Sequence, residues 1–141
     1  MNTLDAIADE FQMVDDETRL EMLLDYAGQL PPLPEVYHAL RDAGLNMVHE
    51  CQSPVFLMIE VKQGVVRLHA DVPDEAPTAR SFTTLMVKAF DGASPQVVLD
   101  APDDILHRFG LTHLLGMQRT RGLRAIYQRI KNEVARIMAD R

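Results

Sequence analysis

Cysteine is nearly absent from this chain, which has Cys51 as its single thiol among 141 residues. One cysteine excludes an internal disulfide, and it excludes a metal site built from several thiolates. The sequence contains no Cys-x-x-Cys or His-x-x-x-His spacing, so we expect no resident metal. Cys51 is then either a small buried side chain, as is common for free cysteine, or a single sulfur used as nucleophile or acceptor.

Long apolar segments are also missing, because no run approaches the ~20 residues that a membrane-spanning helix requires. The sequence has no glycine-rich phosphate-binding loop and no interleaving of basic and aromatic residues for RNA. Asp and Glu outnumber Lys and Arg by 21 to 14, and the net charge of −7 disfavours non-specific binding to phosphates. An acidic N-terminus without an apolar core is unlike a signal peptide. We therefore expect a cytoplasmic protein with neither a membrane nor a nucleic acid as partner.

The length is that of one ordinary domain, so we expect a single domain over residues 1–141. Apolar residues recur at helical spacing in four segments, and two shorter segments favour a helical turn. The four long segments are about 3–11, 15–29, 79–90 and 119–138, and the two short ones are 35–43 and 103–109.

Strand signals lie in the middle of the chain. Residues 55–61 are rich in β-forming side chains, residues 62–64 form a turn, and residues 65–72 alternate between apolar and polar, which predicts an antiparallel hairpin. Residues 45–48 favour a further short strand, and residues 97–99 favour an extended piece. The pattern predicts an α+β fold with a small antiparallel three-stranded sheet and helices packed on one face.

Cys51 lies between two of these predicted strands, in a connection where Gln52, Ser53 and Pro54 supply turn chemistry. Functional side chains are often placed on such connections, whereas a core cysteine more naturally occupies an inward strand position. The carboxylate of Glu50 should raise the pKa of the Cys51 thiol if the two side chains face one another.

Three segments together resemble the SufE family of sulfur-acceptor proteins. They are the CQSPV segment that begins at Cys51, the LPPLP segment at residues 30–34, and residues 111–123, which are similar to the family's block Leu-x-x-His-Leu-Ser-Pro-x-Arg-x-Asn-Gly-Leu. The segments follow in the family's order and spacing over roughly residues 20–136. The resemblance implies a SufE-like fold, similar to that of iron–sulfur scaffold proteins.

The resemblance also implies a function. Members of the family accept a persulfide sulfur from a PLP-dependent cysteine desulfurase, stimulate that enzyme, and pass the sulfur to an iron–sulfur scaffold complex. They are accessory proteins and hold no cofactor of their own. By position Cys51 is the persulfide acceptor, Arg119 matches the family's arginine and Gly122 its glycine, with Gln52, Ser53 and Arg121 beside them. The sequence leaves a homodimer open.

The chain departs from the family pattern at several positions, three of which bear on the site. Glu50 stands where the family has glycine before the cysteine, Leu114 where it has histidine, and Arg121 where it has asparagine. The nearest histidine, His113, is one residue away and would point elsewhere on a helix. These departures leave open whether the partner is the standard desulfurase or a related enzyme. None of them changes the acceptor itself, Cys51.

Arginines at the start of the last predicted helix are candidates for stabilising a thiolate. Arg119 and Arg121 bring positive charge, and the helix N-terminus adds a favourable dipole. The basic cluster on this helix is more simply explained as the solvated face of an amphipathic helix, and the alternative is a docking surface for an acidic partner. Its members are Arg119, Arg121, Arg124, Arg129 and Lys131.

Two other functions remain open from the residues alone. His49 is two residues from Cys51 and would share its face on a strand, which leaves room for a Cys–His hydrolase or a one-cysteine peroxide reductase. A hydrolase would need a third group to orient the histidine, and the sequence identifies none. The last alternative is a non-catalytic interaction module whose cysteine is inert.

Overall fold

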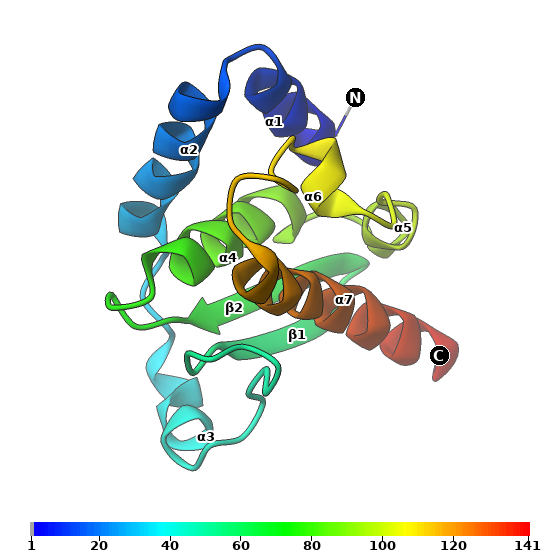
Figure 1. Cartoon of the computed structure of the whole chain (residues 1–141). Helices are drawn as coiled ribbons and strands as arrows, with labels where there is room; N and C mark the ends of the chain where they lie inside the picture. The colour runs from blue at the N-terminus through cyan, green and yellow to red at the C-terminus, as the bar shows by residue number, and fades with distance from the viewer. Residues whose placement is uncertain (1) are drawn as a thin grey trace.

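The structure, a computed structural model, describes residues 2–141, and Figure 1 shows the arrangement of its elements. Seven α-helices, two strands and two short 3₁₀ turns are described in this range. The helices are α1 (Thr3–Gln12), α2 (Asp16–Asp25), α3 (His38–Asp42), α4 (Pro77–Phe90), α5 (Pro95–Leu99), α6 (Ile105–Arg108) and α7 (Met117–Ala139). The strands are β1 (Phe56–Lys62) and β2 (Val65–Asp71), and the 3₁₀ turns are Tyr26–Gln29 and Glu35–Tyr37.

The strands β1 and β2 form an antiparallel hairpin, as predicted, and a two-residue turn joins them. Gln63 and Gly64 both have positive φ, the geometry that matches the right-handed twist of the strands. Side chains alternate between the two faces of the hairpin, and one face is apolar. On this face Leu57 pairs with Ala70 and Ile59 with Leu68. That face is buried, so it carries the core of the molecule.

The helices α4 and α7 cover this apolar face and contact each other (Figure 1). The helix α4 is buried along most of its length, including Phe82, Leu85 and Met86. The apolar side of α7, with Leu123 and Ile130, closes the core over β1. The N-terminal half of α7 therefore has a fixed position relative to the strand that follows Cys51.

The segment around α3 lies on the other side of the hairpin from α4 and α7 (Figure 1). Tyr37 donates a hydrogen bond to Glu60 of β1, and its ring lies 5.1 Å from that of His69 on β2. Arg41 pairs with Asp71 at 2.8 Å. The prediction of helices on one face thus holds for α4 and α7, and the other face has only a partial polar cover.

The predicted third strand at residues 45–48 does not form, so the sheet has two strands. This segment makes one isolated bridge, between Met47 and Phe56. Asn46 has a φ of 56°, outside the strand region, so the backbone is not extended through this segment. The prediction failed because apolar composition does not reveal where a backbone turns left-handed.

The extended piece predicted at residues 97–99 is also wrong, because these residues belong to α5. Pro95 occupies a first-turn position of this helix, where its fixed φ favours helical backbone. Val98 is fully buried, and α5 packs on α7. Tertiary burial outweighs the β preference of two adjacent valines here.

A buried arginine joins the N-terminal helices to the rest of the molecule. The Arg19 side chain on α2 donates to the carbonyls of Phe11, Val14 and Gly110 at 2.8, 2.8 and 3.1 Å. It also pairs with Asp16 at 2.9 Å. The guanidinium tolerates burial because its three nitrogens all find acceptors. No local pattern indicates this role, since an arginine in a surface helix usually faces water.

None of the helices within residues 2–141 is both long and apolar enough to cross a membrane. In the same residues, no group of three or more His, Cys, Asp or Glu side chains is placed to hold a metal ion.

Candidate functional site

Cys51 lies in a loop, residues 48–55, whose two ends are fixed in the core. The backbone N–H of Val48 donates to the carbonyl of Val55 at 2.9 Å, which closes the loop at its base. Val48 and Val55 are 2% and 0% exposed, so both ends are anchored by apolar burial. Cys51 itself donates its N–H to the Val48 carbonyl at 3.4 Å. The loop therefore presents Cys51 from a rigid base, in a connection before β1 as the sequence predicted.

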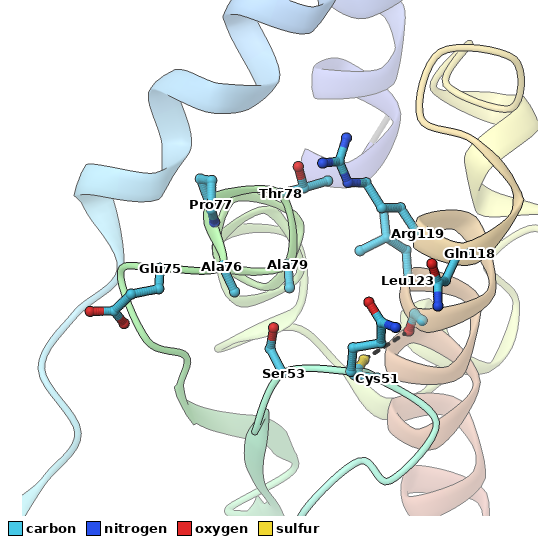
Figure 2. Close-up of a pocket in the computed structure, with 12 residues that line it drawn as sticks. Cys51, Ser53, Glu75, Ala76, Pro77, Thr78, Ala79, Gln118, Arg119 and Leu123 are labelled. Carbon is cyan, nitrogen blue, oxygen red and sulfur yellow. Dashed lines mark hydrogen bonds between the residues drawn. The ribbon is translucent and has the colours of Figure 1, made fainter.

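The Cys51 sulfur rests against the backbone of α7 (Figure 2). The Sγ–H donates to the Gly122 carbonyl at 3.3 Å, and the thiol is half-buried. A Cβ at position 122 would lie 3.2 Å from Sγ and 3.6 Å from the Cys51 Cα. Gly122 is therefore the position on α7 that lets the loop approach the helix backbone.

The environment of the sulfur favours the protonated thiol. Burial is the larger cause and the Glu50 carboxylate the smaller cause of a rise in the pKa of Cys51 to about 11. The hydrogen bond to a carbonyl acts in the same sense, because only the protonated sulfur can donate. In the free protein Cys51 is thus a protonated thiol near neutral pH.

A hollow of about 260 Å³, which we call the Cys51 hollow, opens beside the thiol. It lies where the Cys51 loop, the start of α4 and the start of α7 meet (Figure 2). Four of the predicted site residues line it with Cys51, namely Gln52, Ser53, Arg119 and Gly122. The structure thus brings together positions about 70 residues apart in the sequence.

The α4 side of the Cys51 hollow was missed by the sequence analysis. Residues 75–79, with Thr78 among them, form this wall, and Gln118 lies next to Arg119 on the α7 side. No spacing connects residues 75–79 to Cys51, because the hairpin separates them in the chain. The one local signal that could have marked this wall is Pro77, because proline is common in the first turn of a helix.

Arg119 lines the Cys51 hollow without contacting the sulfur. In Figure 2 its guanidinium extends toward Thr78 and away from Cys51. It is exposed, and within residues 2–141 it forms no ion pair. Its stabilisation of a thiolate therefore stays a prediction, and the two causes that set the pKa of the free thiol are burial and Glu50.

Arg121 lies on the other side of the Cys51 loop. It lines a second hollow, of about 470 Å³, which we call the arginine hollow. Arg124, Arg129 and Glu50 line the same hollow. Two of the positions that depart from the family pattern, Glu50 and Arg121, thus lie together in the arginine hollow and outside the Cys51 hollow.

The histidines named in the sequence analysis lie away from the sulfur. His49 is exposed, and the turn geometry of residues 49–53 replaces the strand that would have aligned it with Cys51. The Nε2 atom of His113 is 3.1 Å from a carboxylate oxygen of Asp16. Leu114 packs against the core. The geometry gives Cys51 no imidazole partner among the described residues.

The hairpin, the helical layer and the loop thiol define an α+β protein built around one half-buried cysteine. The family model SufE, described as an Fe-S metabolism associated domain, matches residues 5–134. The chain is 34% identical to an uncharacterized SufE-like protein of Mycobacterium tuberculosis over 129 residues, which are 91% of this chain and 88% of that one.

A similar match extends over 138 residues of an uncharacterized SufE-like protein of Rhizobium meliloti, at 31% identity and 94% and 95% of the two chains. A solution structure of a hypothetical protein from Thermus thermophilus matches with a TM-score of 0.82, at 35% identity and 96% of each chain. This chain belongs to the SufE family, and its role lies in iron–sulfur metabolism.

We expect the alkylation of Cys51 to reveal its raised pKa. Because only the thiolate reacts, the rate with iodoacetamide at pH 8 should be about a hundredfold below that of a free cysteine with the ordinary value of 9.0, and it should rise until about pH 11. Glu50→Gln should increase the rate at pH 8 severalfold, but burial should keep it below the free-cysteine rate. A rate that levels off near pH 9 would contradict the described environment.

The packing of Cys51 on α7 predicts a specific effect of Gly122→Ala. The new Cβ would press on Sγ at 3.2 Å, so the loop should shift outward and the alkylation rate at pH 8 should rise. Global stability should change by no more than about 1 kcal/mol, because alanine also favours the helix. Gly28→Ala is the matched control, since a Cβ there meets no atom within 4 Å. Equal alkylation rates in both variants would show that the contact does not hold the loop.

Proposed function

We propose that this protein is a sulfur acceptor for a PLP-dependent cysteine desulfurase. Cys51 takes the sulfur from the enzyme as a persulfide, and the protein passes it to an iron–sulfur scaffold complex. The observation that carries the proposal is the lone thiol on a core-anchored loop, half-buried beside a hollow, in a member of the SufE family. Sulfur transfer needs one acceptor sulfur, whereas a scaffold or a redox couple needs a second thiol.

The chemistry is a thiol–persulfide exchange. The Cys51 thiolate attacks the outer sulfur of the persulfide on the desulfurase cysteine, and a new S–S bond forms at Cys51. The S–S bond on the desulfurase breaks, and its cysteine leaves as a thiolate. No external oxidant or reductant is required, because the sulfur moves at the persulfide oxidation level. The proton lost from Cys51 passes to solvent or to a base of the desulfurase.

The loop and the Cys51 hollow suit a carrier in two ways. The raised pKa of Cys51 keeps the free thiol protonated, which protects it from oxidants between encounters. The adjacent hollow has room for an added sulfur atom, lined by the hydroxyl-bearing residues Ser53 and Thr78 and by Gln118 and Arg119. A persulfide anion placed there would gain polar donors and a nearby positive charge.

In this proposal the Cys51 thiol is activated only in the complex with the desulfurase. The thiol must give up its hydrogen bond to Gly122 and its proton before it can attack. Both changes follow if docking draws the loop away from α7. The protein is in this account a carrier and an activator, and it is not itself an enzyme.

The direct test is incubation of the full chain with a cysteine desulfurase, PLP and cysteine, followed by intact mass measurement. We expect the mass of one added sulfur atom on the wild-type chain and none on Cys51→Ser. Treatment with a reductant should remove the added mass. No gain with the desulfurase of the same organism would refute the proposal, and rapid sulfenic acid formation with peroxide would favour the peroxidase alternative.

In the same assay, Arg119→Ala should slow the appearance of the persulfide by about tenfold, because the Cys51 hollow would lose its positive charge. The fold should be intact, since Arg119 is exposed. Arg136→Ala, an exposed arginine farther along the same helix, is the control and should leave the rate unchanged. Equal rates for all three chains would remove Arg119 from the mechanism.

A further inference from the structure

The arginine hollow lies on α7 beside the Cys51 loop, and the proposed function does not use it. Arg121, Arg124 and Gln128 follow one another at helical spacing, so they share one face of α7. Arg121 and Arg124 are exposed, and Arg129 is half-buried. Asn132 continues this face and accepts a hydrogen bond from Gln128 at 2.8 Å. The face therefore presents guanidinium and amide donors around a concave surface.

The arginine hollow is more positively charged than the chain as a whole. The chain carries a net charge of −7, yet three of the lining residues are arginines and two, Glu50 and Asp103, are acids. Arg124 is 3.8 Å from Asp104, outside the hollow, whereas Arg121 forms no ion pair within residues 2–141. A free guanidinium in a concavity is suited to bidentate binding of a carboxylate.

The arginine hollow is connected to the Cys51 loop and to the residue that precedes it. Glu50, the residue before Cys51, lines the hollow from the loop side. Arg129 donates to the carbonyl of Met47 at 3.2 Å, just before the loop begins. A carboxylate that entered the hollow would repel Glu50 and attract the arginines, so its binding would act on the loop that holds Cys51 against Gly122.

We propose that the arginine hollow is the docking site for an acidic segment of the sulfur donor, the cysteine desulfurase. This inference rests on the proposed function. The donor binds the protein while the Cys51 thiol is hydrogen-bonded to the Gly122 carbonyl. This hydrogen bond must break before Cys51 can accept sulfur. The sulfur recipient meets the persulfide form, in which the Sγ–H bond to Gly122 no longer exists. A docking site coupled to the loop through Glu50 therefore serves the donor.

The test compares two double variants with equal charge. Arg121→Gln with Arg124→Gln alters the arginine hollow, and Lys88→Gln with Arg136→Gln removes two exposed positive charges elsewhere. The purified desulfurase with PLP is titrated against each full-length chain by calorimetry at low and moderate salt. We expect the hollow variant to bind about tenfold more weakly with a smaller salt dependence, and the control to change by less than about twofold.

The outcomes separate this proposal from the proposed function. Equal binding of the two variants would overturn the docking site, even if wild-type Cys51 accepts sulfur. Weaker binding of the hollow variant together with no persulfide on the wild-type chain would retain the docking site and refute the sulfur acceptor. Normal desulfurase binding by the hollow variant, with slowed delivery of sulfur to an iron–sulfur scaffold, would assign the arginine hollow to the recipient and overturn the proposal. Thermal unfolding of both variants checks that each is folded.

Discussion

The contact between the Cys51 loop and the backbone of α7 is the constraint on which the site depends. Helix α7 is fixed because its apolar side closes the core over β1, and the loop is fixed because Val48 and Val55 are buried at its base. Two rigid parts therefore meet at one place, and the absence of a side chain at Gly122 determines how closely they meet. This close approach buries the Cys51 thiol and allows its hydrogen bond to the Gly122 carbonyl. Burial is in turn the larger cause of the raised pKa of Cys51.

The same contact separates two surfaces with different chemistry. On one side of the loop the sulfur opens onto the Cys51 hollow, whose walls come from α4 and α7 and carry hydroxyl and amide groups. On the other side Glu50 faces the arginine hollow. The Cys51 thiol is thus kept apart from the arginine hollow although Glu50 and Cys51 are neighbours in sequence. The proposed carrier would benefit from this separation, because a partner bound at the arginine hollow would leave free the space that a transferred sulfur requires.

Local sequence patterns predicted most of the fold. The hairpin turn and the long apolar stripes of α4 and α7 are signals carried by neighbouring residues. The failures occurred where composition is a poor guide to the backbone. Residues 97–99 are helical because Val98 is buried where α5 packs on α7, and residues 45–48 form no strand because Asn46 turns left-handed. The role of Arg19 is also invisible locally, since one of its carbonyl partners, Gly110, is 91 residues away in the chain.

The sequence by itself determined that Cys51 is the only thiol of the chain, that it lies on a loop between apolar anchors, and that the chain resembles the SufE family. These conclusions need only the count of a residue type and the order of short motifs. The tertiary structure decided the rest: that Gly122 holds the sulfur, that residues 75–79 complete the Cys51 hollow, and that Arg119 and Arg121 lie on opposite sides of the loop. The physical reason is that a helix turns about 100° per residue, so two arginines two positions apart point in nearly opposite directions. Which of them lines the hollow beside the thiol depends on how α7 is rotated in the core, and that rotation is set by packing.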